Sequence, residues 1–301
     1  MTWGTGIHNH LDIDEYHSQC CPGVSISSSG LREIVATCPA RYWATSDLNP
    51  NRVKRESEAL SLGKAAHALV LGEPQFNAKF VIAPFDKFTT KESREWRDDQ
   101  KRQIVKPAEM IIIEQMVSAQ RSSEQVAHAF INGEPEMSII WQDPETEIWL
   151  KARPDWLPND PKTEFTIEYK TAANIAPGAL SWDAFKYGYH LQAALTLDGL
   201  SAVLGITPLG LAHVVQEKQA PFLAELRMFQ PDQIAFGRQQ YRHALHIFAD
   251  CLSKNHWPGF TDGPSFFKTP IHIKRMMENP DDYAARYGTD VYGFDAAGIT
   301  E

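Results

Sequence analysis

The sequence predicts an α/β protein in which a central mixed β-sheet, built around a meander, is flanked by helices. Three observations lead to this prediction: short runs rich in β-forming residues occupy the middle of the chain, strong turn signals separate them, and longer helical patterns precede and follow them. Strand and helix patterns mixed in this way favour a sheet covered by helices.

The composition is that of an ordinary globular protein, with 301 residues, 43% hydrophobic and 22% charged. The net charge of −9 argues against a passive nucleic-acid coat protein, but not against an enzyme with a local basic channel. The four cysteines lack the spacing of a secreted disulfide framework, and the sequence shows neither a signal-peptide pattern nor an apolar run of membrane-spanning length. We therefore expect a cytoplasmic protein without membrane association.

The first half of the chain is predicted to be mainly helical. A polar extension covers 1–24, and the serines after it offer N-caps for a helix over 31–37, which stops before Pro39. The other elements expected here are helices over 56–71 and 107–130 and a short strand at 81–83.

The second half contains the predicted meander, with strands expected at 138–141, 147–153 and 164–171. Asp143-Pro144 and the segment 158–161 supply the turns between them. The elements expected after the meander are a helix over 181–197, strands at 211–215 and 222–229, and a helix over 232–252. Without an internal repeat or a clear linker, one domain is expected over 25–275, with an acidic tail over 276–301.

The strand expected at 164–171 carries different side chains on its two faces. Apolar Ile167 and Tyr169 point one way, because side chains alternate along a strand. Glu168 and Lys170 point the other way. Asp155 lies thirteen positions before Glu168, across the turn at 158–161. If the two strands pair around this turn, Asp155 comes close to Glu168.

Two carboxylates held together repel one another unless a positive charge lies between them. A divalent cation with oxygen ligands is the natural solution. Lys170 would then stabilise charge on a phosphate, or position and help deprotonate a water. The alternative is an edge strand with an ordinary exposed pair, which is the commoner meaning of an isolated E-x-K.

Pro154-Asp155 followed by Glu168-Tyr169-Lys170 resembles the signature of the PD-(D/E)xK nuclease superfamily, with its restriction-endonuclease-like core. The surroundings are similar to one branch, the exonuclease VIII (RecE-type) family of phage and prophage recombination exonucleases. The further segments that match this branch in order and spacing are 27–43, 62–71, 133–136, 189–194 and 257–260. Together they cover most of residues 25–270.

The resemblance implies a catalytic set and a metal site. The implied catalytic residues are Asp155, Glu168, Lys170 and Gln192. One or two Mg²⁺ ions, with Mn²⁺ as a substitute, would be held by Asp155, Glu168, His67 and the backbone carbonyl of Tyr169. Glu136 is a further candidate ligand, and a solvated loop glutamate explains it equally well. Without the resemblance, His67 would be interpreted as a buried helix histidine bonded to backbone.

The helix after Lys170 carries Tyr189 and Gln192 three positions apart, so they share a face. The resemblance implies that both contact DNA beside the scissile phosphate. Thr196 stands where the family usually has a tyrosine, so Tyr189 substitutes for that tyrosine or the role is unfilled. Core packing is the other interpretation of Tyr189.

The segment 87–106 has seven basic and four acidic residues, a local charge of +3. Basic residues with an interleaved aromatic suit a DNA backbone, although a solvated helix is the commoner structure. The predicted DNA-binding residues here are Arg94, Trp96, Arg97, Lys101 and Arg102.

The resemblance further implies degradation of linear double-stranded DNA from 5′ ends, which leaves 3′ single strands for recombination. It also implies a toroidal homo-oligomer and a single-strand annealing protein as partner. Two alternatives stay open: a catalytically silent DNA-end-binding or scaffold protein, and an endonuclease or Cas4-like trimming enzyme on the same fold. No iron–sulfur cluster is expected, because only Cys251 lies downstream of the core.

Overall fold

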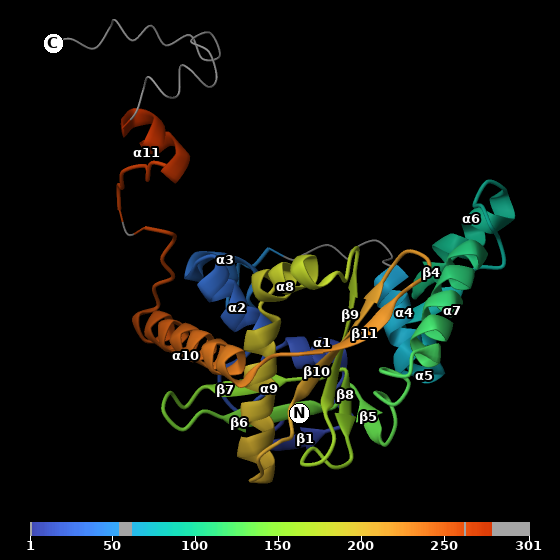
Figure 1. The fold of residues 1–301 in the computed structure, drawn as a ribbon, viewed down its shortest axis with the longest axis horizontal. Helices are drawn as coiled ribbons and strands as arrows, with labels where there is room; N and C mark the ends of the chain where they lie inside the picture. The colour runs from blue at the N-terminus through green and yellow to red at the C-terminus, as the bar shows by residue number, and fades with distance from the viewer. Residues whose placement is uncertain (1, 54–61, 262, 279–301) are drawn as a thin grey trace, which may run out of the picture. The chain divides into compact units, whose positions relative to one another are not determined.

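The computed structural model describes residues 2–53, 62–261 and 263–278. Internal contacts divide the chain into two compact units, 1–260 and 261–301. Mixed sheets flanked by helices make up the first unit (Figure 1), so the predicted α/β fold class is confirmed. The described part of the second unit contains α11 (Ile271–Glu278). Most of the predicted acidic tail, and the first part of the helix expected over 56–71, lie outside the described residues.

The first sheet has the strand order β1–β6–β7–β2. Its strands are β1 (Gly6–His8), β2 (Ser25–Ser27), β6 (Ser138–Gln142) and β7 (Trp149–Ala152). β6 is antiparallel to β1 and β7, whereas β2 is parallel to β7. β6 and β7 are the first two strands of the predicted meander.

The second sheet has the strand order β11–β10–β9–β8–β5. Its strands are β5 (Gly133–Pro135), β8 (Trp156–Pro158), β9 (Thr166–Ala172), β10 (Leu211–Glu217) and β11 (Ala224–Met228). The last strand of the meander, β9, therefore lies in a different sheet from β6 and β7. Pro154, which has no N–H to donate, follows β7 where the chain passes from one sheet to the other.

β9 and β10 run parallel, so a crossover must connect them. Two helices supply it, α8 (Pro177–Lys186) and α9 (Tyr189–Leu204), where one helix over 181–197 was expected. Gly188 separates them with a φ of +68°. A side chain there would be strained and would lie 2.8 Å from Cδ of Arg32. The glycine therefore sets the direction in which α9 begins.

The largest hydrophobic core lies between the first sheet and four helices: α2 (Ser28–Ala36), α3 (Pro39–Thr45), α9 and α10 (Pro231–Lys254). Leu31, Ile139, Leu195, Leu245 and Phe248 are fully buried there. Buried residues of α10 recur every three or four positions, which gives this helix one apolar face.

A second core holds together the segment 62–122. The elements that contribute to this core are α4 (Leu62–Leu71), α5 (Glu73–Lys79), β3 (Phe80–Ile82), β4 (Gln103–Val105) and α7 (Pro107–Ser122). The same segment contains α6 (Lys91–Asp98), which lies outside the core. α7 ends before the expected position 130. Ser123 donates a hydrogen bond to the Ala224 carbonyl at 3.2 Å, and Val126 turns into the core beside Ile167.

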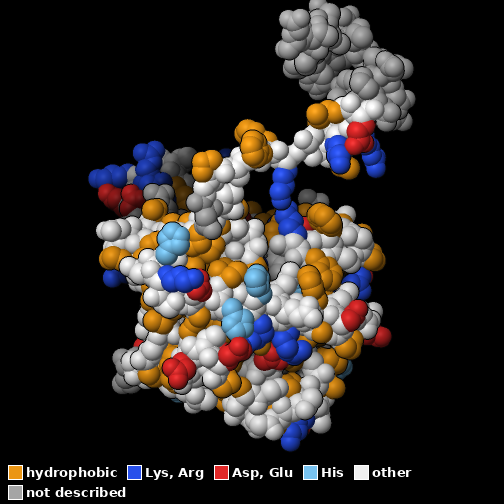
Figure 2. All heavy atoms as spheres, turned by 90° about the vertical axis from the view of Figure 1, so that its left-hand side faces the viewer, with side chains coloured by type: hydrophobic (Ala, Val, Ile, Leu, Met, Phe, Trp, Pro, Cys, Tyr) orange, Lys and Arg blue, Asp and Glu red, His pale blue; other side chains and the backbone are white. Residues whose placement is uncertain are grey.

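The N-terminal segment expected as a polar extension contributes β1 and α1 (Ile13–His17). Leu11, Tyr16, Cys20 and Cys21 are buried against Ile140 of the first sheet. On the face of the first unit seen in Figure 2, acidic and basic side chains are interspersed. Within the described ranges no helix combines the length and apolar character that crossing a membrane requires.

Candidate active site

The antiparallel pairing of β8 with β9 brings Asp155 beside Glu168. Trp156 pairs with Ile167, which puts the preceding Asp155 opposite Glu168. The backbone N–H of Tyr169 donates a hydrogen bond to Asp155 Oδ2 at 2.7 Å. The turn predicted at 158–161 thus connects the two carboxylates, as expected.

β9 separates apolar from charged side chains in the predicted way. Ile167 and Tyr169 belong to a buried cluster with Val126 and Val214. On the other face, Glu168 is 1% exposed, and Lys170 Nζ lies 2.6 Å from Glu168 Oε2 and 4.0 Å from Asp155 Oδ2. This is not the exposed pair of an edge strand, because β9 has neighbours on both sides and its glutamate is buried.

Helix α4 brings His67 to this cluster. Gly63 makes the approach possible, because a Cβ there would lie 2.3 Å from Thr171 Oγ1 on β9. One turn further, His67 stacks on the Tyr169 ring at a centroid distance of 5.7 Å. Its Nε2 lies 3.0 Å from Asp155 Oδ1, without the geometry of a hydrogen bond. The spacing between Gly63 and His67 therefore follows from packing: the glycine allows α4 to approach β9, and the histidine one turn later contacts Tyr169.

Burial and mutual charge shift the pKa values of the two carboxylates in opposite directions. Burial raises the pKa of Glu168 to about 7, and the Asp155 carboxylate adds to the rise against the opposing effect of Lys170. Burial also acts to raise the pKa of Asp155. The charges of His67 and Lys170, together with the hydrogen bond from the Tyr169 N–H, outweigh it and hold the pKa of Asp155 well below its usual range.

The two basic groups respond to the same carboxylates. Burial acts to lower the pKa of Lys170, but Glu168 and Asp155 raise it above its ordinary value. Burial likewise acts to lower the pKa of His67, and the neighbouring Asp155 more than compensates, so the net shift is upward. The four side chains therefore form one electrostatic unit, in which changing one charge alters the others.

Tyr189 completes one side of the cluster, at the start of α9. Lys170 Nζ lies 5.7 Å from the centre of its ring, and the ring stacks on His213 at 5.5 Å. Gln192 is half-buried one turn later, and no hydrogen bond among the described residues joins its side chain to Asp155, Glu168 or Lys170. Thr196 is buried and donates to the Gln192 carbonyl at 2.9 Å, so it faces the helix and core.

Glu136 lies close to the cluster but has its own partner. Its backbone N–H donates to the Asp155 carbonyl at 3.1 Å, and its residue has a φ of +51°. Lys79 Nζ lies 2.7 Å from Glu136 Oε1. Its carboxylate also acts on the pKa of His67, so it stands within electrostatic reach.

The predicted DNA-binding residues of the segment 87–106 lie apart from the cluster of Asp155, Glu168, Lys170 and His67. They sit on and just after α6, which Figure 1 shows beyond α4 when viewed from β9. Arg94 donates to the carbonyls of Phe88 and Thr89, and Arg102 donates to that of Asn77. Trp96 stacks on Phe88 at 6.3 Å, Arg97 pairs with its neighbour Asp98 at 2.8 Å, and Lys101 is exposed.

The donor chemistry of the cluster fits a divalent cation. Asp155, Glu168 and His67 supply oxygen and imidazole ligands, and Glu168 Oε1 is buried without a hydrogen-bond partner in the described part of the chain. As placed, no three acidic, histidine or cysteine side chains of the described residues are arranged to hold an ion. Lys170 takes up the other oxygen of Glu168. Glu168 Oε1 is therefore the oxygen of this carboxylate that is left for a cation.

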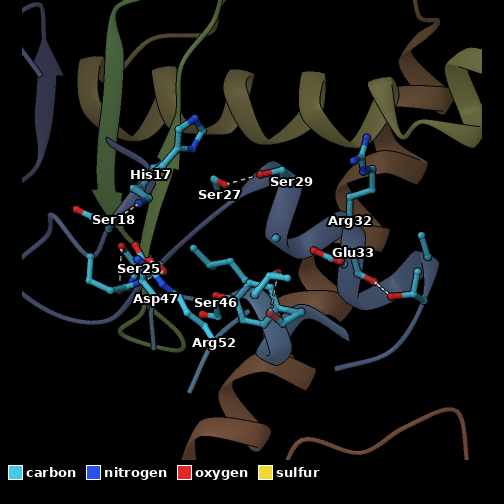
Figure 3. Close-up of a pocket in the computed structure, with 18 of the residues that line it drawn as sticks. His17, Ser18, Ser25, Ser27, Ser29, Arg32, Glu33, Ser46, Asp47 and Arg52 are labelled. Atoms are coloured by element: carbon cyan, nitrogen blue, oxygen red, sulfur yellow. Dashed lines mark hydrogen bonds and ion pairs between the residues drawn. The ribbon is translucent and has the colours of Figure 1, made fainter. Parts of the chain in front are cut away.

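A pocket of about 1080 Å³ lies over the N-terminal segment and α2, and none of Asp155, Glu168, Lys170 and His67 lines it. The residues that line it come from the N-terminal segment, α2, α3 and the α8–α9 junction (Figure 3). Arg32 donates to the Tyr187 carbonyl at 2.8 Å, and the Tyr187 ring lies 6.2 Å from that of Tyr189. Tyr187 is therefore the pocket residue that connects this wall to Tyr189.

Sequence reasoning did not identify His213 or Arg32 as neighbours of the site. His213 is buried on β10 directly beside Glu168. Its signal was a histidine within an otherwise apolar strand, but only the parallel pairing of β9 and β10 reveals its position. Arg32 reaches the α8–α9 junction because Gly188 leaves room for it.

Comparison with solved structures finds a similar fold. A Eubacterium rectale protein named "Putative exonuclease" matches with a TM-score of 0.59 and 12% identity, over 90% of this chain and 100% of that chain. Comparison with curated proteins finds no match. A family model, described as a PDDEXK-like domain of unknown function (DUF3799), matches residues 27–269 and therefore contains Asp155, Glu168, Lys170 and His67. The chain belongs to this family of PDDEXK-like domains.

Proposed function

We propose that this protein is a metal-dependent nuclease that hydrolyses phosphodiester bonds of DNA. The observation that carries the proposal is the buried cluster of Asp155, Glu168, Lys170 and His67, which three separate elements bring together. The PDDEXK-like family and the fold of the Eubacterium rectale protein support it. Burying two acidic groups, a histidine and a lysine together costs desolvation free energy. Clusters of this kind, in which the groups shift one another's pKa values, are typical of functional sites.

Domains of this class generally use divalent metal ions. Asp155, Glu168 and His67 would hold the ion, with the Tyr169 carbonyl as a further donor and Glu136 within reach of a second ion. A bound Mg²⁺ supplies charge stabilisation at the phosphate and lowers the pKa of a bound water. Glu168, with its pKa of about 7, must lose its proton to take part.

Lys170 is best suited to act through its positive charge. Its raised pKa keeps the ammonium protonated at neutral pH beside Glu168 and Asp155. An ammonium can orient a water and stabilise negative charge on a phosphate, but it cannot accept a proton. Of the two roles expected for Lys170, the electrostatic one is therefore supported over deprotonation of the water. Tyr189 would hold Lys170 in place through its ring.

The finer features of the activity rest on the resemblance to exonuclease VIII. We propose a 5′-to-3′ exonuclease on linear double-stranded DNA, active with Mg²⁺ in the cytoplasm, that provides 3′ single strands for recombination. A toroidal homo-oligomer and a single-strand annealing partner belong to the same proposal. Arg32 and Lys186 line the pocket beside Tyr187, together with three acidic residues, and we propose that these two basic side chains contact the DNA backbone.

The experiment is digestion of linear duplexes labelled separately at each 5′ and 3′ end, with a closed circular duplex alongside. With Mg²⁺ we expect early release of the 5′ label, a retained 3′ label and an intact circle, and no release in EDTA. Cleavage of the circle would replace the exonuclease proposal by an endonuclease. Binding of ends without cleavage under any divalent ion would favour the silent scaffold.

A further inference from the structure

A second, smaller pocket shares Tyr189 with the catalytic cluster. Its volume is about 320 Å³, near the lower end of the range for small-molecule sites. α8, the start of α9, β10 and the segment from β11 into α10 form its walls. We call it the aromatic slot and define it by four lining residues: Phe185, Tyr189, His213 and Phe229.

The walls of the aromatic slot are flat rings at defined angles. Tyr189 and His213 stack at 5.5 Å with an interplanar angle of 16°. Phe229 stands nearly perpendicular to His213, at 5.5 Å and 87°, and Phe185 meets Phe229 at 5.6 Å and 77°. Phe185 is 38% exposed, so the slot reaches the surface at this residue. Such walls suit a flat ring that can stack on one face and meet ring edges on another.

The slot also contains an unsatisfied polar group. His213 is 3% exposed, and its Nε2 is buried without a hydrogen-bond partner among the described residues. Buried polar atoms in native proteins are nearly always hydrogen-bonded, so an unpaired one needs an explanation. A neutral imidazole ring has one donor and one acceptor. A ligand with polar edges would satisfy it.

The slot lies one strand away from the acidic residues. His213 on β10 is the register partner of Glu168 on β9, and adjacent strands are about 4.8 Å apart. Lys170 and the slot share the Tyr189 ring. A phosphodiester held at Glu168 and Lys170 and a ring in the slot would therefore lie on neighbouring strands, on either side of the shared Tyr189 contact.

We propose that the aromatic slot binds one unstacked nucleobase of the DNA strand whose phosphodiester lies at Glu168 and Lys170. This inference rests on the proposed nuclease function and adds how the substrate strand is held. A nucleobase is flat, has a stacking face, and carries donors and acceptors on its edge, which matches the rings and the His213 imidazole. An aliphatic side chain from another protein would fill the slot but leave His213 Nε2 unpaired. The enzyme therefore requires a base that has left the helical stack.

The test is an abasic scan of DNA binding. Labelled single-stranded oligonucleotides, each with one base removed at a successive position, are bound to the full chain with Ca²⁺ in place of Mg²⁺. Fluorescence anisotropy gives the affinity, and a gel confirms that each oligonucleotide stays intact. We expect one position at which loss of the base weakens binding by about 10-fold, the effect of losing one base–aromatic stack, with little change at positions farther from it.

Variants then connect that position with the slot. Phe185→Ala is expected to weaken binding of the complete oligonucleotide by about 10-fold. It should also remove the positional effect, because the variant already lacks the stacking contact that an abasic position would abolish. Phe185→Tyr, which keeps the ring, should retain both. Trp182→Ala is the matched control: Trp182 is on the same helix, is 75% exposed and lies outside the slot lining, so the positional effect should persist.

A flat scan, or a positional effect that survives in Phe185→Ala, would overturn the slot. These outcomes are separable from failure of the proposed function, because the scan requires no cleavage. If the affinity does not depend on the abasic position while the wild type cleaves DNA with Mg²⁺, the base-binding slot is rejected and the nuclease proposal stands. A positional effect that Phe185→Ala abolishes, in a protein that cleaves nothing, supports base binding and removes the nuclease proposal.

Discussion

Two charged regions of this protein have similar residues and very different surroundings. At β8 and β9, Asp155, Glu168 and Lys170 are largely buried, and each shifts the pKa of the others. On α6, Arg97 is exposed and pairs with the adjacent Asp98, while Arg94 bonds to nearby backbone carbonyls. Exposed pairs between neighbours contribute little, because water and salt screen them.

The difference teaches that charge is informative about function where the fold has removed it from water. The α6 region keeps its predicted role in DNA binding as a prediction, and nothing in its contacts requires that role. The β8–β9 region cannot be explained by solubility, because its charges are buried and interdependent. Substitutions in the β8–β9 region should therefore have large effects on activity, and substitutions on α6 should have small ones.

The largest effect is expected for Asp155→Asn. This change removes a charge that both His67 and Lys170 contact, and with it a proposed metal ligand. We expect cleavage of linear duplex with Mg²⁺ to fall by at least about 10³-fold, more than the 10–100-fold typical of groups outside the ligand shell. Asp160→Asn is the matched control, since Asp160 lies in the following turn and its carboxylate accepts hydrogen bonds from the Lys162 N–H and the Thr163 hydroxyl. Equal activity of the two variants would remove Asp155 from the site.

Gly63→Val should have the next largest effect. The first added carbon would lie 2.3 Å from Thr171 Oγ1, so α4 must move away from β9 and take His67 with it. A displacement of about 1 Å in a catalytic group costs on the order of 10²-fold in rate. We expect a kcat loss of about 10–100-fold and a lower Tm. Gly178→Val, where nothing lies within 4 Å, should leave the kcat nearly unchanged. A Gly63→Val variant with wild-type kcat would contradict the close packing of α4 on β9.

Glu168→Gln should inactivate the protein yet stabilise it at alkaline pH. The folded pKa of Glu168, about 7, lies above its ordinary value of 4.5, so folding favours the protonated form. The wild type therefore loses stability as pH rises from about 4.5 to 7, whereas glutamine has no proton to lose. We expect the Tm of Glu168→Gln to exceed that of the wild type by about 3 °C or more at pH 8 and to match it at pH 5. A variant less stable than the wild type at pH 8 would mean that Lys170 stabilises the carboxylate more than burial penalises it.

The smallest effect is expected on α6. Arg97→Ala and Lys101→Ala remove exposed charges, so each should weaken DNA binding by about 2- to 5-fold at low salt and less at high salt. Binding titrations at two salt concentrations would measure this. A loss of cleavage as large as that of Asp155→Asn would show that α6 belongs to the active site. The two regions would then not differ in their importance for activity.

Much of this arrangement follows from local sequence. Alternation along β9 and the turn at 158–161 predicted the approach of Asp155 to Glu168, because both act over a short stretch of chain. The passage of the meander into two sheets and the break at Gly188 were not predictable from hydrophobic patterning. His213 could not be placed either, because its position depends on a parallel pairing across two intervening helices.

The most direct test of the buried cluster as the active site compares Lys170→Ala with Lys101→Ala in one assay. Both variants lose one lysine, and thermal unfolding first confirms that each is folded. With linear duplex and Mg²⁺, we expect nucleotide release by Lys170→Ala to fall at least about 10³-fold below the wild type. Lys101→Ala should stay within about 5-fold. Wild-type release by a folded Lys170→Ala would contradict the account.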